Sequence, residues 1–228
     1  MDEMWAGFIR ALQLIASLNH EVMEITARSL SISLSSVFIA SLICIPLGGL
    51  IEFRRIPGKG TLVNIIQTLY SLPTVTVGLL VFLLLSRSGP LGGLGLLYTP
   101  QGMVIGQTIL IAPILIGLTI SAFRGVNVQL KETAVSLGAT DLQVIFTVIK
   151  EARVAIIAAI LLAFGRALSE VGVAMMIGGN IRWYTRVLTT SIALETSRGD
   201  LELSIALGII LICLSLGVNL LIGRVQGR

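Results

Sequence analysis

The chain has 228 residues, a formal net charge of +4 and a mean hydropathy of +0.97. Hydrophobic residues make up 55% of it and charged residues only 12%. A soluble protein of this size cannot bury so much apolar surface, so the composition excludes a soluble domain and predicts a membrane protein. We attribute the basic excess to contact with the inner membrane surface and expect no nucleic-acid-binding surface.

Five apolar stretches are long enough to cross a bilayer as helices. A hydrocarbon core of about 30 Å needs roughly 20 apolar residues per crossing. Residues 5–18 are too short and include Arg10, so they are expected to form an amphipathic helix in the membrane interface. With no linker in between, residues 1–228 are predicted to form a single all-α, polytopic membrane domain. The five stretches are residues 29–51, 61–85, 103–123, 152–177 and 203–222.

The positions of lysine and arginine predict the orientation. With the N-terminus outside, the inner segments hold nine basic residues and the outer segments six, and Arg166 lies within a span. Inner loops are the basic ones in most membranes. The C-terminus and residues 124–151 are therefore predicted to be cytoplasmic.

Residues 124–151 are predicted to form two short helices with a Gly-Ala-Thr-Asp break at 138–141. Thr140 or Asp141 can cap the second helix. A short helix is marginal in water, so its apolar face is expected to pack either on the chain's own helix ends or on a separate partner. The residues at helical spacing on the first helix are Leu130, Ala134, Leu137 and Gly138.

Pro73 interrupts the second apolar stretch and is surrounded by hydroxyl side chains. Broken backbone at membrane depth is tolerated chiefly where it faces protein or a water-filled cavity. A proline or glycine in a span can also serve only close helix packing. On the first interpretation, the candidate pathway residues here are Ser71, Pro73, Thr74 and Thr76.

The segment Glu132-Thr133-Ala134, three further residues and Gly138 resembles the cytoplasmic "EAA" loop of ABC-type importer permeases. Thr133 stands where that family usually has alanine, and Lys150-Glu151 replaces its closing Leu-Pro, so the entry into the fourth span should be less sharply bent. The resemblance implies that this loop docks into a groove on a separate ATPase. The coupling residues it implies are Lys131, Glu132, Thr133, Ala134, Leu137, Gly138, Ala139, Thr140 and Asp141.

Residues 165–182 and 193–200 resemble the oxyanion-importing branch of these permeases, with tungstate permeases closest and molybdate permeases next. The resemblance implies a type I ABC importer permease that binds no cofactor itself and forms a homodimer. It also implies two ATPase subunits that bind ATP and magnesium, and an extracytoplasmic oxyanion-binding protein. Tungstate and molybdate have the same charge and nearly the same size, and both stay open as substrates.

Arg166 and Glu170 lie four residues apart in the fourth stretch, with Ser169 beside them. A charge at this depth costs several kcal/mol and is usually paired and turned inward, and this spacing allows pairing on one helix face. Two interpretations stay open. The pair either fixes helix packing, or Arg166 lends positive potential to a dianion pathway while Glu170 weakens the binding. Arg166, Ser169 and Glu170 therefore join the candidate pathway residues.

A rival from another class is a secondary transporter or channel in which Arg166 and Glu170 couple ions or protons. Inverted repeats and paired broken helices would support it, and the sequence shows one broken segment, at Pro73. No catalytic or metal site is expected. Lys59 lies in an incomplete phosphate-loop motif, and Cys44 and Cys213 are interpreted as small buried hydrophobic residues.

Overall fold

Every regular element in the described residues, 2–54 and 57–227 of the computed structural model, is a helix, as the composition predicted. Two of the elements, η1 and η2, are single 3₁₀ turns. The elements are α1 (Asp2–Ala16), α2 (His20–Phe53), α3 (Lys59–Thr68), η1 (Leu69–Ser71), α4 (Thr74–Leu85), η2 (Gly92–Leu94), α5 (Pro100–Arg124), α6 (Val128–Ser136), α7 (Asp141–Leu168), α8 (Gly172–Gly178), α9 (Leu188–Arg198) and α10 (Leu201–Val225).

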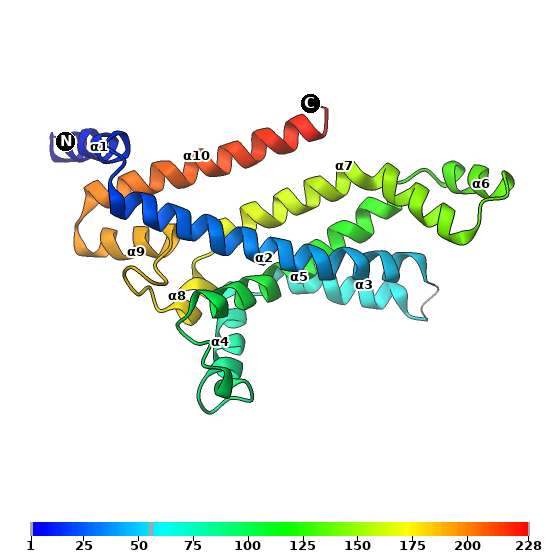
Figure 1. The fold of residues 1–228 in the computed structure, drawn as a ribbon, viewed down its shortest axis with the longest axis horizontal. Coiled ribbons are helices and arrows are strands. Elements are labelled where there is room, and N and C mark those ends of the chain that lie inside the picture. The colour runs from blue at the N-terminus through cyan, green and yellow to red at the C-terminus, as the bar shows by residue number, and fades with distance from the viewer. Residues whose placement is uncertain (1, 55–56, 228) are drawn as a thin grey trace.

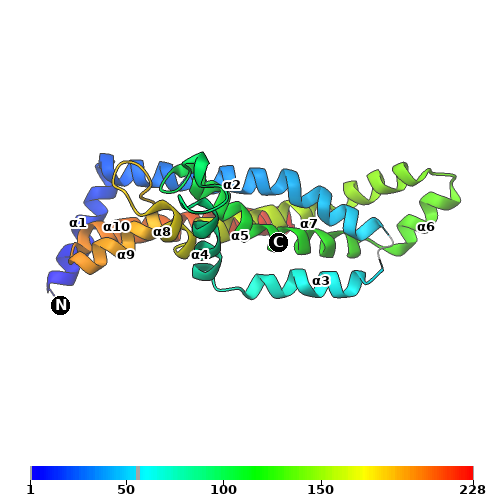
Figure 2. The same cartoon turned by 90° about the horizontal axis from the view of Figure 1, so that it is seen from below.

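The long helices α2, α5, α7 and α10 run side by side and form an elongated bundle, with α3 alongside (Figures 1 and 2). The centre of the bundle is packed with small side chains, which let helix backbones approach closely in a membrane. Gly48 of α2 shows how close, because a Cβ there would lie 2.9 Å from the Thr119 side chain of α5. The buried cluster at the centre comprises Val37, Ala40, Cys44, Ile111, Leu115, Ala159, Ala163 and Ala167.

The expected spans are realised in different ways. Among the described residues, α2, α5 and α10 are single helices long and apolar enough to cross a bilayer. The pair formed by α3 with η1 and by α4 is bent by 98° and counts as a fourth span only if its two parts are taken together. The stretch predicted at 152–177 is divided, because α7 ends at Leu168 and α8 begins at Gly172. The expected N-terminal helix is present as α1, beside α10.

Two chain breaks meet in the middle of the molecule. The first is at Pro73, where the chain turns by 98° between η1 and α4. The second lies between α7 and α8, and the sequence did not predict it. The two breaks are in contact at Gly172, where a Cβ would lie 2.7 Å from the Thr74 hydroxyl and 3.0 Å from the Val75 amide nitrogen. Only glycine allows this approach.

The two cysteines differ in environment. Cys44 is buried between α2 and its neighbours, as expected, whereas Cys213 is exposed on α10, so the expectation of burial was wrong for Cys213. An apolar helix face that meets lipid has no need to be covered by protein.

Candidate functional site

Arg166 and Glu170 form an ion pair at the break between α7 and α8. The Arg166 Nη1 atom donates to Glu170 Oε2 at 2.7 Å, and the amide of Val173 donates to Glu170 Oε1 at 3.0 Å. The Glu170 side chain is only 1% exposed, whereas the Arg166 side chain is 35% exposed. One buried carboxylate thus neutralises the arginine and also satisfies an amide in the first turn of α8.

Two further polar side chains satisfy backbone carbonyls near the end of α7. Gln107 of α5 is buried, and its amide donates to the carbonyl of Ala167 at 3.3 Å while its carbonyl accepts from Ser36 at 3.2 Å. The Thr189 hydroxyl donates to the carbonyl of Glu170 at 2.7 Å. The break is therefore held by α2, α5 and α9 together, as a buried polar network must be.

The structure gathers some of the predicted pathway residues and leaves others apart. Thr74 is half-buried against Gly172, so it lies at the junction of the two breaks, beside the segment that carries Ser169 and Glu170. Ser71 and Pro73 are exposed before α4, and Thr76 is exposed in its first turn. The Ser71 hydroxyl bonds back to the carbonyl of Thr68 at 2.8 Å, and that of Ser169 to the carbonyl of Arg166 at 3.2 Å.

The predicted helix, break and second helix are all present at residues 124–151, as α6 and the start of α7 (Figure 1). Gly138 has φ +83°, and the amide of Ala139 bonds the carbonyl of Ala134 at 3.0 Å, which is a left-handed helix end that favours glycine. Thr140 caps α7 in a capping box with Gln143. The second cytoplasmic helix continues without a break into the apolar stretch predicted at 152–177, because both belong to the 28-residue helix α7.

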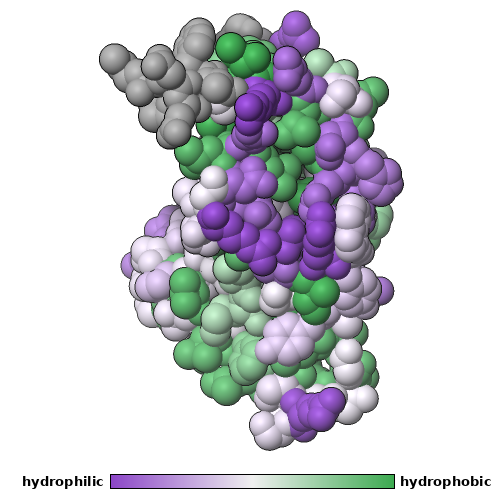
Figure 3. Space-filling model, turned by 90° about the vertical axis from the view of Figure 1, so that its left-hand side faces the viewer, coloured by the Kyte–Doolittle hydropathy of each residue, from purple (hydrophilic) through white to green (hydrophobic). Residues whose placement is uncertain are grey.

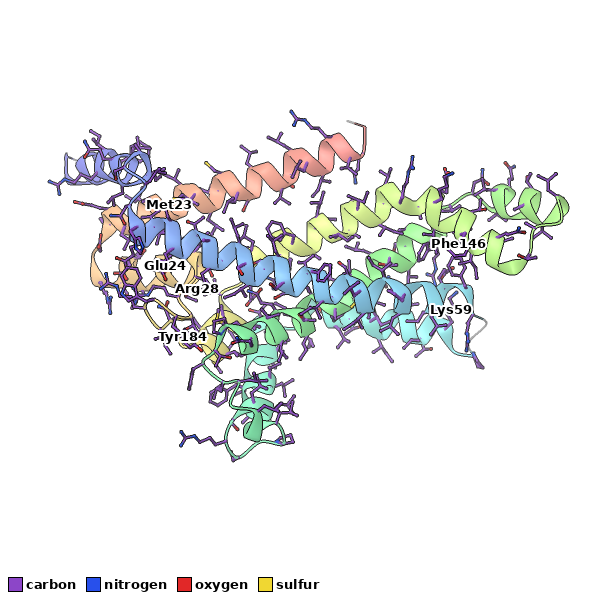
Figure 4. The ribbon with its side chains drawn as sticks, in the orientation of Figure 1. Met23, Glu24, Arg28, Lys59, Phe146 and Tyr184 are labelled. Atoms are coloured by element: carbon purple, nitrogen blue, oxygen red, sulfur yellow. The ribbon has the colours of Figure 1, made fainter. Side chains whose placement is uncertain are left out.

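The predicted apolar face of α6 is divided between the chain itself and solvent. Leu130 packs against buried residues of α5 and α7, and Ala134 is half-buried. Leu137 is 83% exposed, and Glu132 and Thr133 are also exposed. The side chains of Lys131 and Asp141 lie outside the part of the chain that the structure describes. Val128, Val135 and Phe146 are exposed as well, so apolar side chains gather on this surface (Figure 4).

An apolar groove of about 550 Å³ lies next to this surface, between α2, α5 and α7. Ile145 and Ile149 of α7 line it, with Phe123 of α5 on another side. At the same end, Lys59 Nζ and Arg124 Nε lie 2.9 and 3.0 Å from Glu52 Oε2 and tie together α2, α3 and α5. Lys59 therefore has a structural partner in this chain.

A second polar cluster occupies the opposite end of the bundle, and the sequence analysis did not find it. Arg182 donates to both carboxylate oxygens of Glu21 at 2.9 and 2.7 Å, which raises the pKa of the arginine above its ordinary value. Arg186 is buried, and its Nη1 atom lies 3.2 Å from Glu195 Oε1. A hydrophilic band covers this end, and Glu24 and Arg28 lie on the same side (Figures 3 and 4).

The signal that would have revealed this cluster is the charge content of residues 178–202. Arg182 and Arg186 lie there shortly before the short helix α9, and Glu195 lies within it. In a membrane protein, charges near an apolar helix are expected to be paired. They bind the start of α2 to α9 and the loop before it.

The two members of the central ion pair should contribute unequally to stability. Arg166→Gln leaves a buried carboxylate with one amide donor, which costs about 3–5 kcal/mol. Glu170→Gln keeps an acceptor for the Val173 amide and leaves an arginine that reaches solvent, which costs about 1 kcal/mol. Thermal unfolding of the two purified variants in detergent should show a clearly lower midpoint for Arg166→Gln. Equal losses would contradict this account of the pair.

Comparison with known proteins identifies the family. The family model for the "binding-protein-dependent transport system inner membrane component" matches residues 44–228. A probable anion ABC transporter permease protein of Haloferax volcanii is 42% identical, over 91% of each chain. The tungstate uptake system permease protein TupB of Peptoclostridium acidaminophilum is 39% identical over 99% of each chain. The molybdenum permease ModB of Escherichia coli is more distant, at 29% over 63% of this chain and 67% of its own.

Solved structures show the same fold. A chain of the MetNI methionine ABC transporter, in inward-facing conformations, superimposes with a TM-score of 0.71 at 18% identity, covering 94% of this chain and 97% of that one. A chain of an amino acid ABC transporter gives 0.70 at 18% identity, covering 94% and 96%. The chain therefore belongs to the binding-protein-dependent inner membrane components, the non-catalytic, multi-pass permease subunits of ABC importers.

Proposed function

We propose that this chain is the permease of an ATP-driven importer for an oxyanion, with tungstate as the substrate. The observation that carries the proposal is likeness to tungstate uptake permeases along almost the whole chain. The anion permease relative supports the substrate class. Molybdate is the second candidate, supported by the more distant molybdenum permeases.

The importer family depends on a binding protein and on an ATPase. In our proposal two copies of this chain form the membrane part. Two ATPase subunits, which hold ATP and magnesium, dock on the cytoplasmic side, and an oxyanion-binding protein delivers the substrate from outside. The N-terminus is outside and the C-terminus is cytoplasmic, because the inner loops then carry the larger share of the basic residues.

The surface around Leu137 is the proposed ATPase contact. It is apolar and exposed on a short, capped helix that projects beyond the bundle (Figure 1). Such a surface on a single copy marks a protein-binding site. This stretch of the chain contains all nine candidate coupling residues, which are Lys131, Glu132, Thr133, Ala134, Leu137, Gly138, Ala139, Thr140 and Asp141.

The junction of the two breaks is the proposed oxyanion pathway. Arg166 is the charged residue there whose side chain is partly exposed, while Glu170 is buried and neutralises part of its charge. An oxyanion needs positive potential at membrane depth, but it must also leave, and a partly neutralised arginine meets both requirements. Thr74 and Ser169 add hydroxyl groups close to this point.

Uptake into proteoliposomes tests the proposed function. With the permease, its ATPase and its binding protein reconstituted, tungstate uptake should require ATP and should stop when the ATPase is inactivated by mutation. Titrating the binding protein with tungstate and molybdate then identifies the substrate. Uptake driven by an ion gradient, with this chain alone, would contradict the proposal and favour a secondary transporter.

The pathway role of Arg166 is testable without leaving an unpaired charge. The double variant Arg166→Gln/Glu170→Gln removes both charges together, so the fold should be nearly unaffected. Tungstate uptake should fall at least about tenfold, which corresponds to roughly 1.4 kcal/mol. Full uptake with normal assembly would show that the pair serves only helix packing. Arg166→Lys keeps the charge and should retain more uptake than the neutral double variant.

The docking role of Leu137 is testable at one position. Leu137→Asp should weaken binding of the ATPase by a factor of about 30 or more, because truncation of a central apolar contact costs about 2 kcal/mol or more. Leu137→Met should bind normally, since it keeps the apolar contact. Leu137 is 83% exposed in the single copy, so neither change disturbs the chain's own packing. Co-purification of the ATPase measures the effect, and equal recovery with both variants would exclude this contact.

A further inference from the structure

The apolar groove between α2, α5 and α7 has an unpaired cation at one end. Its lining on α2 extends from Ile45 to Arg54. The Arg54 side chain is exposed and makes no hydrogen bond or ion pair with any residue that the structure describes. The groove is therefore apolar along its length and positively charged at the end of α2, just after Phe53.

A glycine and two aromatic rings shape the groove. A Cβ at Gly49 would lie 3.3 Å from the Phe123 ring, and the ring centroids of Phe123 and Phe53 are 5.1 Å apart. Because Gly49 has no side chain, the space beside these rings stays unfilled. Leu50 and Ile149 also line the groove and are 46% and 39% exposed. The groove therefore opens on the surface of this chain.

The groove has the length of one membrane leaflet. From Ile45 to Arg54 the helix rises over nine residues, which is about 14 Å at 1.5 Å per residue. Half of a hydrocarbon core of about 30 Å is about 15 Å. Since α2 is a spanning helix and the groove follows its last turns, an acyl chain that lies in the groove stays within one leaflet.

The charges at this end of the groove favour an anion. Lys59 and Arg124 share the carboxylate of Glu52, at 2.9 and 3.0 Å. With Arg54 added, three cations and one carboxylate leave a surplus of two positive charges. Basic pockets between transmembrane helices bind anionic lipid headgroups. Lys59 and Phe146 mark this end of the molecule in Figure 4.

We infer that an anionic phospholipid binds in this groove, with an acyl chain along α2 and its headgroup phosphate on Arg54. An apolar groove alone fits any apolar occupant, but the unpaired guanidinium at its end selects an occupant that carries an anion there. Arginine donates to phosphate through two parallel hydrogen bonds, which gives the contact a defined geometry. Only the assignment to the inner leaflet rests on the orientation in the proposed function.

Fluorescence quenching by brominated lipids in proteoliposomes tests the inference. The reporter is Leu50→Trp in a chain with Trp5→Phe and Trp183→Phe, which removes both native tryptophans. Brominated phosphatidylglycerol should bind beside this reporter about fivefold more tightly than brominated phosphatidylcholine, the factor expected for one basic residue near an anionic headgroup. A Leu216→Trp reporter on α10, outside the groove, should show equal affinity for the two lipids.

Substitution of the cation separates the headgroup contact from general attraction to anionic lipid. Arg54→Gln should abolish the preference at position 50, and Arg54→Lys should retain it. Arg224→Gln is the matched control, because Arg224 is also exposed near the end of a spanning helix but lies outside the groove. It should leave the preference unchanged.

Three outcomes of the quenching measurement would overturn the inference. The first is equal binding of the two lipids beside the position 50 reporter, and the second is a preference that survives Arg54→Gln. The third is weak quenching by both lipids, with or without the ATPase present. That result would show that protein, either the ATPase or a second copy of this chain, fills the groove.

A second measurement leaves the lining of the groove unaltered. Phosphatidylglycerol added to the purified native chain in detergent, at about ten times its dissociation constant, should raise the midpoint of thermal unfolding by about 3 °C or more above that with phosphatidylcholine. Equal midpoints would reject the site. Neither measurement uses ATP or an oxyanion. A lipid preference without ATP-driven uptake would reject only the proposed function, and uptake without the preference would reject only the lipid site.

Discussion

A single buried carboxylate holds the centre of this molecule together. Glu170 lies where α7 ends and α8 begins, and it accepts from the Arg166 guanidinium and from the amide of Val173. The backbone carbonyl of Glu170 accepts a hydrogen bond from the Thr189 hydroxyl of α9. A helix cannot be broken inside a membrane unless the freed groups find partners in protein or water. The change of direction at α8, and with it the contact between α8 and α4, depends on these bonds.

Ion pairs hold helices together at both ends of the bundle. At one end Arg186 and Glu195 are buried as an ion pair, and Arg182 donates to both carboxylate oxygens of Glu21. These pairs fix the loop before α9 to α9 and to the start of α2. At the other end charges serve the same purpose around Glu52, but α6 projects with Leu137 uncovered.

The sequence was sufficient wherever a local rule decided the structure. Apolar length placed α2, α5 and α10, the Gly138 and Thr140 signals placed the end of α6 and the start of α7, and Pro73 marked the bend before α4. It was insufficient where contacts between distant residues decided. The stretch 152–177 is mostly apolar and contains no proline, so no local signal shows that the helix is interrupted there. The freed backbone groups are satisfied by Glu170 together with Gln107 and Thr189, which come from other parts of the chain. The exposed Cys213 was mispredicted because an apolar span says nothing about which of its faces meets lipid.

The continuity of α7 links the two proposed sites mechanically. It begins at the Thr140 cap beside α6 and ends two residues before Glu170, without interruption over 28 residues, or about 42 Å. The predicted second cytoplasmic helix and the fourth predicted apolar stretch, as far as Leu168, are thus one continuous helix. In our proposal, a displacement of α6 by the ATPase moves the Arg166 end of the same helix, because a packed helix is displaced as a body and is not compressed. The break at Glu170 is then the first point along the chain where that motion can be converted into a change of the passage.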